Sequence, residues 1–242
     1  MTPNPSSPPV AAEPSAMPIV ALVLAILGLC LPPLLLVALI LAIVSLAKSG
    51  EPAYAARKGL AIAALVVPVA LLPVVGVLAA IAIPNFIKFQ ARAKQSECKV
   101  NLKAAFVGQK SLYGERNTYS PLIKDVGFLP ERGNRYAYYF EVRGAFLEPG
   151  STPTGKEVGI LPDRQRYPGL DVDRYAAAVP PDALPGVEGQ CPDCNFTVVC
   201  VGNVDSDATL DVWSVSNVDR TSPLGEAVPA GMPLNHVNDV TD

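Results

Sequence analysis

The sequence predicts an α+β protein anchored in a membrane, with N-terminal transmembrane helices, one long helix beyond them, and a small antiparallel β-sheet with long loops packed on that helix. Three observations support this fold class. The 242-residue chain is 50% hydrophobic but only 17% charged, whereas soluble domains carry ~25% charged residues. Residues 1–83 contain only five charged residues. Helical periodicity follows this stretch, and β-rich segments separated by turn residues come after it.

The first 18 residues form a Pro-, Ser- and Ala-rich tail. We expect this tail to be disordered, because it has too little apolar surface to offset the entropy of ordering. A cleaved secretory signal starts with a basic region, but the first basic residue here is Lys48. The apolar segments that follow are therefore expected to remain in the protein.

Two uncharged segments predict a two-helix membrane domain over residues 19–75. Ile19–Ala47 has 29 residues and is interrupted by two adjacent prolines, so it is either one kinked span or a hairpin of two half-spans. Gly59–Ile83 has 25 uncharged residues and predicts a transmembrane helix whose prolines neighbouring helices can accommodate.

The loop between these segments indicates the orientation. Lys48, Arg57 and Lys58 outnumber Glu51 there, so the positive-inside rule places the loop in the cytoplasm. The C-terminal part, residues 115–242, is then an extracytoplasmic globular head.

A long helix is predicted from residue 60 to 114, within the membrane to about residue 83. Between Asn85 and Tyr113 the chain has no proline, and apolar residues recur at helical spacings: Phe89, Ala93, Val100, Ala104 and Val107. Pro84 is expected to kink this helix.

The head is predicted to contain a small antiparallel sheet. Three β-rich stretches support it: Tyr136–Val142, Phe196–Val201 and Thr209–Val215. A polar turn separates the last two, which predicts a hairpin. Gly144–Gln190 is rich in Pro and Gly and is expected to be an extended surface loop.

Several motifs carry a family resemblance. Gly76–Ser120, with its LAAIAIPNF core, resembles the N-terminal helix of type IV pilins. GFLPERGNRYAYYF, CPDCNF and GNVDSDATLDVW follow in the order found in the major pilins of myxobacteria. The resemblance implies a non-enzymatic structural subunit of a pilus or pseudopilus system for motility, adhesion or secretion. It also implies a bacterial inner-membrane location, a periplasmic or extracellular head, and contacts with membrane lipid and with pilin subunits or further copies through the long helix.

The chain departs from the pilin pattern at the start of this helix. Pilin precursors have a leader that ends in Gly and a Glu five residues later, and counting back from Pro84 these positions hold Ile62 and Val67. Lys58–Val67 and the apolar run before it instead resemble a small bacterial two-helix membrane domain of unknown function. We therefore expect the chain to escape prepilin peptidase and to remain a polytopic membrane protein.

Small and aromatic residues are the predicted assembly contacts. Small residues let membrane helices approach one another, and aromatic residues add contacts just beyond the membrane. The set is Gly76, Ala79, Ala80, Ala82, Pro84, Phe86 and Phe89.

Four cysteines lie beyond the membrane segments: Cys98, Cys191, Cys194 and Cys200. Outside the cytoplasm they predict two disulfides, and the sequence leaves the pairing open. Two alternatives use the same residues. The Cys191–Cys194 pair has the spacing of a thiol redox motif, and four cysteines could hold zinc. Cys30 is expected to be a small hydrophobe within the membrane.

Asn203, Asp205, Asp207 and Asp211 alternate like the first ligands of a calcium loop. Ala208 and Ser214 replace its glycine and final glutamate, so the pattern indicates at most a weak calcium site, which would suit a calcium-dependent adhesin head. The alternative is a hairpin turn in which these side chains bond to their own backbone. No other cofactor is indicated.

The remaining features indicate packing rather than chemistry. His236, the single histidine, has no adjacent nucleophile motif and is expected to be a tail residue. Trp213 is expected in the core. A net charge of −3 and a pI near 5.3 make nucleic acid an improbable partner.

Overall fold

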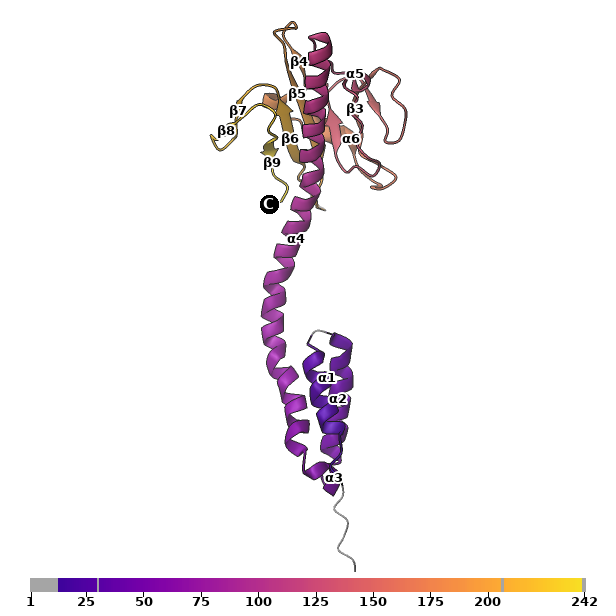
Figure 1. Cartoon of the computed structure of the whole chain (residues 1–242), viewed down its shortest axis with the longest axis vertical. Coiled ribbons are helices and arrows are strands. Elements are labelled where there is room, and N and C mark those ends of the chain that lie inside the picture. Colours follow the sequence, from indigo (N-terminus) through magenta and orange to yellow (C-terminus); the bar gives the residue numbers. More distant parts are fainter. Residues whose placement is uncertain (1–12, 30, 206, 241–242) are drawn as a thin grey trace, which may run out of the picture. The chain divides into compact units, whose positions relative to one another are not determined.

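The computed structural model describes residues 13–29, 31–205 and 207–240. Most of the predicted tail, and Cys30, therefore lie outside the described residues. The chain divides into two compact units, Met1–Pro84 and Asn85–Asp242. The long helix α4, Lys58–Arg116, contributes to both (Figure 1).

The first unit consists of helices. Before α4 it contains α1 (Met17–Leu27), α2 (Pro32–Ala47) and the short α3 (Pro52–Ala55). α1 begins inside the stretch predicted to be a tail. Pro32 opens α2, where a proline is favourable because the first N–H groups of a helix have no intrahelical partner.

α1 and α2 form an antiparallel hairpin (Figure 1). Ala21 and Ala42 share one buried cluster with Ala64 of α4. A Cβ atom on Gly28 would lie 2.7 Å from Leu35 Cγ, so the close approach at the end of the hairpin requires glycine. The structure thus shows two helices over residues 19–47 in place of one kinked span.

The helices of this unit differ in their ability to cross a bilayer. With 11 and 16 residues, α1 and α2 rise about 17 and 24 Å, less than the ~30 Å of hydrocarbon. In the described chain α4 is the one helix that is long and apolar enough to span a membrane. Its three internal prolines are of the kind that membrane helices tolerate.

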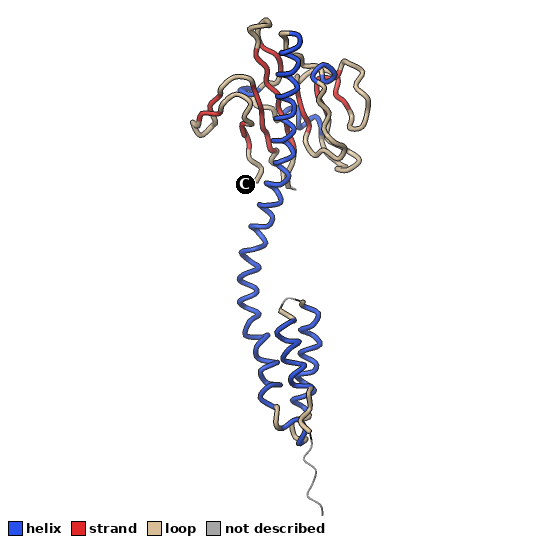
Figure 2. Tube along the Cα trace, viewed as in Figure 1, coloured by secondary structure: helices blue, strands red, loops and turns tan. Residues whose placement is uncertain are grey.

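The second unit, Asn85–Asp242, is called the head from here on. In it the second half of α4 packs against a sheet (Figures 1 and 2). Its short helices are α5 (Ile123–Val126), α6 (Val172–Ala177) and the 3-10 turn η1 (Pro181–Ala183). Its strands are β1 (Ala137–Tyr139), β2 (Ala145–Leu147), β3 (Glu157–Ile160), β4 (Gly186–Glu188), β5 (Asn195–Gly202), β6 (Asp211–Ser216), β7 (Arg220–Thr221), β8 (Ala227–Val228) and β9 (Leu234–Val237).

The sheet has the order β2-β3-β1-β5-β6-β9. β4 and β1 pair with the same edge of β5: β4 with its first residues, and β1 with its last. The predicted β5–β6 hairpin is present, with Val199 opposite Ser214. Two predictions need correction. The sheet is mixed, because β2 pairs with β3 in parallel. Gly144–Gln190 is no bare loop: it supplies β2, β3, α6, η1 and β4, whose short lengths of three to six residues leave too little periodicity to detect.

Both faces of the sheet are covered. On one face α4 packs its buried side chains, such as Leu102, against Tyr138 and Phe196. On the other face Tyr175 of α6 packs against Tyr139 and the odd-numbered valines of β5. The adjacent tyrosines therefore point to opposite faces, because side chains alternate along a strand.

Candidate functional site

The α4 residues predicted as assembly contacts lie on an uncovered part of the helix. Ala79 is half-buried, and the other members, Gly76, Ala80, Ala82, Pro84, Phe86 and Phe89, are exposed. Phe86 and Phe89 are 62% and 65% exposed. In the most apolar 18-residue stretch of α4, none of the described residues is buried. Such a surface is stable only against lipid or protein.

The beginning of α4 has a different environment. Ala61 and Ala64 are buried, and Ala64 packs in the cluster with Ala21 and Ala42 of the hairpin. Ile62 and Val67, the residues predicted to replace the pilin cleavage glycine and glutamate, lie within this helix. Neither side chain can form the ion pair that a glutamate would make.

The head contains two disulfides. Cys98 of α4 is joined to Cys200 of β5, with Cα atoms 6.2 Å apart, and both residues are fully buried. Cys191 is joined to Cys194 in the turn between β4 and β5. The two predicted disulfides are thus present, and the structure supplies the pairing that the sequence left open.

The pairing disfavours a zinc site, and the position of Cys191 and Cys194 before a strand disfavours a redox motif. A four-cysteine zinc site needs free thiolates, and all four sulfur atoms are in disulfides. A redox CxxC motif has a thiol at a helix N-terminus, which lowers its pKa, whereas Cys191 and Cys194 precede a strand.

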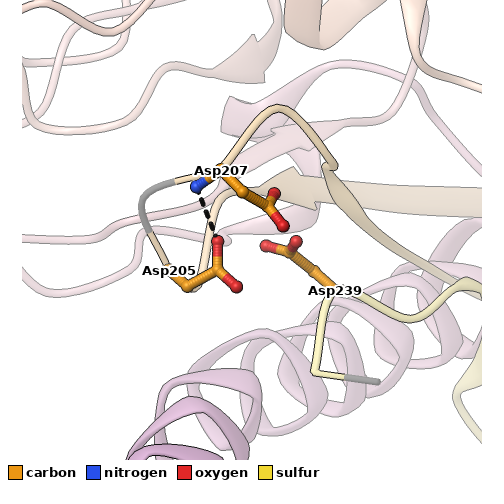
Figure 3. Close-up of side chains that lie close together, drawn as sticks. All are labelled: Asp205, Asp207 and Asp239. Atoms are coloured by element: carbon orange, nitrogen blue, oxygen red, sulfur yellow. Dashed lines mark hydrogen bonds between the residues drawn. The ribbon is translucent and has the colours of Figure 1, made fainter. Parts of the chain in front are cut away.

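The acidic residues of the β5–β6 turn separate into two sites. Asp205 and Asp207 gather with Asp239, which follows β9, and oxygen atoms of the three carboxylates lie within 4.8 Å of one another (Figure 3). Burial, followed by the nearby carboxylates, raises the pKa of Asp239 to about 7. Asn203 precedes these residues in the turn. Its side-chain amide donates to the Asp207 carbonyl at 2.9 Å, as in the predicted turn.

Asp211, the fourth residue of the predicted calcium set, serves the core instead. It is fully buried and accepts hydrogen bonds from Tyr136 Oη at 2.7 Å, Gln95 Nε2 at 2.8 Å and Trp213 Nε1 at 2.7 Å. Burial raises the pKa of this carboxyl group above its ordinary value. Trp213 packs against the α4 core as predicted, with Lys99 Nζ 4.2 Å from the centre of its ring.

His236 is not the tail residue that the sequence suggested. It lies in β9 with a side chain only 5% exposed. Its Nε2 is 2.7 Å from Ser214 Oγ, and its Nδ1 is 3.5 Å from Asp182 Oδ2. Local sequence could not reveal this, because the β6–β9 pairing brings the residues together.

The Ser214–His236–Asp182 arrangement has the order of a hydrolytic triad but lacks access. Ser214 is fully buried, so a substrate carbonyl cannot reach its hydroxyl group. Arg220 also donates to Ser214 Oγ and, at 3.0 Å, to the Met232 carbonyl. The group is therefore a hydrogen-bond network that holds β6, β9 and the chain around β7 together.

Comparison with known proteins agrees with this architecture. The sequence model of the family described as Type IV pilin PilA matches residues 89–211. The type IV major pilin protein PilA of Myxococcus xanthus (strain DK1622) is 41% identical over 192 residues, which cover 69% of this chain and 86% of that relative. The chain belongs to the type IV pilin family.

Family membership confirms the α+β pilin fold and the role of a pilin-like structural protein of a pilus system. Type IV pilins are structural, non-enzymatic proteins, so the thiol redox alternative is not favoured. Homology supports assembly with other pilin subunits, and the apolar helix of the family is consistent with membrane anchoring. The family match begins at residue 89 and therefore leaves the first unit outside it.

Proposed function

We propose that this protein is a pilin-like subunit held in the bacterial inner membrane by its first unit, with its head in the periplasm or outside the cell. In this role it escapes prepilin peptidase and meets pilin subunits, including further copies of itself, through the exposed face of α4. It acts through contacts and catalyses no reaction. The observation that carries the proposal is the uncovered apolar surface of α4 in the stretch that contains Gly76 and Ala80.

The spacing of small residues on α4 favours protein over lipid as the cover for one side of the helix. Gly76 and Ala80 are four residues apart, so they lie on the same side and form a small-xxx-small pair. A Cβ atom on Gly76 would meet nothing within 4 Å. A larger side chain there costs the isolated subunit little and would hinder a partner helix.

The membrane anchoring is supported by the packing at the start of α4. Ala64 is buried against Ala21 and Ala42 of the α1–α2 hairpin. Cleavage before Ala63 would remove the hairpin and leave the Ala64 side chain without these contacts. Lys48, Arg57 and Lys58 lie in the segment between α2 and the first turn of α4, in agreement with a cytoplasmic position of that loop.

Variants at the small residues test the proposed contact. Two differently tagged copies of the full chain are expressed together, extracted in mild detergent, and one tag is captured. We expect Gly76→Ile and Ala80→Ile to lower recovery of the second copy several-fold. The matched control is Leu78→Phe, because two residues correspond to about 200° around a helix and Leu78 lies on the opposite side. Equal recovery from all three variants would contradict the proposed face.

A further inference from the structure

Three carboxylates from distant parts of the sequence converge at one end of the head sheet. Asp205 and Asp207 belong to the turn after β5, whereas Asp239 follows β9. β9 pairs with β6 so that Val237 lies opposite Val212, which places the residues after β9 beside the β5–β6 turn. Oxygen atoms of all three groups lie within 4.8 Å of one another (Figure 3).

The deepest of these carboxylates has an oxygen without a partner. Asp239 is only 1% exposed. Its Oδ2 accepts a hydrogen bond from the Val204 N–H at 2.8 Å, but its Oδ1 is buried and bonded to nothing in the described part of the chain. The Asp239 carboxylate points toward Asp207 (Figure 3). An unpaired buried carboxylate oxygen is costly, and a bound cation would offset that cost.

The protein's own cations near this turn are bonded to carbonyl groups. Lys94 Nζ donates to the Val204 carbonyl at 2.5 Å, and Arg135 Nη1 donates to the Asn203 carbonyl at 3.3 Å. Within residues 13–240, apart from residues 30 and 206, no Lys, Arg or His nitrogen lies within 4.0 Å of the three carboxylates. Lys94 is near enough to Asp205 and Asp239 for their charges to act on its ammonium group, but it forms no ion pair with them, so the mutual repulsion of the three carboxylates is only partly offset.

We propose that Asp205, Asp207 and Asp239 bind a calcium ion that ties the C-terminal segment of the head to the β5–β6 turn. The ligands are all oxygen atoms, which suits a hard cation and disfavours zinc. A partly exposed group of carboxylates that leaves room for water fits the flexible coordination of Ca²⁺ better than the strict octahedron of Mg²⁺.

The proposed ion would stabilise the side of the head where α4 enters it. Val240, next to Asp239, is buried in the same core as Val204 and Ala91 of α4. The turn is also held to α4 through Lys94. A cation would thus fix the last strand, the β5–β6 turn and this part of α4 relative to one another. This inference goes beyond the proposed assembly role and does not depend on it.

The test is calcium binding by the full chain purified in detergent, first stripped with EDTA. Titration with CaCl₂ in a calorimeter and the thermal unfolding of Trp213 fluorescence give two readouts. We expect a Kd of about 10⁻⁴–10⁻³ M, typical of extracellular sites, and a Tm that rises with calcium. Asp239→Asn should weaken binding at least tenfold. Asp193→Asn, an exposed aspartate in another turn, is the matched control and should bind as the wild type does.

Stability without calcium separates loss of the site from loss of the fold. In EDTA, Asp239→Asn should be as stable as the wild type or more stable, because it removes a buried charge beside two others. Should this variant fail to fold, Asp205→Asn replaces it, since an Asn oxygen can still accept the Asp207 N–H. The absence of heat and of a Tm shift in the wild type at ~10 mM CaCl₂ would overturn the proposal. An equal response to MgCl₂, or an unchanged response in Asp239→Asn, would overturn it as well.

Discussion

The disulfide between Cys98 and Cys200 should contribute most of the covalent stabilisation of the head. It connects α4 to the central strand across a sequence separation of 102, whereas Cys191–Cys194 spans only 3. Closing these loops lowers the chain entropy of the unfolded state by amounts equivalent to about 4.7 and about 1.9 kcal/mol. The double variant Cys98→Ala/Cys200→Ala should therefore lose more than twice as much free energy of unfolding as Cys191→Ala/Cys194→Ala.

Trp213 provides the assay. It is the single tryptophan and packs against the same core as both cysteines of the buried bridge, so its fluorescence follows unfolding of the head in denaturant. Alanine avoids the unsatisfied hydroxyl group that serine would bury beside Leu102. Losses that differ by less than ~1 kcal/mol, or a larger loss in the Cys191/Cys194 variant, would refute the loop-closure reasoning.

Four further substitutions test the packing and the hydrogen bonds of the head. A Cβ atom on Gly108 would lie 2.7 Å from the Val126 carbonyl oxygen, whereas a Cβ atom on Gly114 would meet open space. In denaturant titrations, Gly108→Ala should therefore lower the free energy of unfolding by about 1–3 kcal/mol, and Gly114→Ala should raise it by about 0.5–1 kcal/mol. Tyr136→Phe removes a donor from the buried Asp211 and should cost about 1–3 kcal/mol in the same assay, so an unchanged midpoint would contradict the role given to that bond. Burial lowers the pKa of His236, with Asp182 and Arg220 beside it. Near pH 6.5 the unfolded chain then takes up a proton that the folded head does not. The contribution of His236 to the free energy of unfolding should therefore fall as the pH drops below 6.5, and His236→Gln should flatten that part of the stability profile.

Long periodic patterns predicted the fold well. The helix expected from residue 60 to 114 is observed as Lys58–Arg116, because its apolar spacing persists over many turns. The β5–β6 hairpin was equally clear from its β-branched residues and polar turn. The short strands of the middle segment cannot be predicted from sequence, because three or four residues show no reliable period. β2 and β3 depend instead on pairing with each other and with β1.

The candidate sites were predicted only where neighbours in sequence are also neighbours in space. Asp205 and Asp207 were found from their spacing, but Asp211 alternates with them in sequence and turns into the core as β6 begins. Asp239 and His236 carry no local signal, since the pairing of β9 with β6 gives each of them its environment. The cysteines were identified by type and compartment, and the fold alone decides the pairing.

Intact mass and N-terminal sequencing show whether the protein keeps its N-terminal unit or is processed like a pilin. The protein is isolated separately from inner membranes and from sheared surface filaments. We expect the full-length chain of 25.4 kDa in the membrane fraction, with its N-terminal unit still attached. A chain trimmed to begin near Ala63 and recovered from filaments would contradict this expectation, and would show that prepilin peptidase accepts this chain without the usual glycine and glutamate.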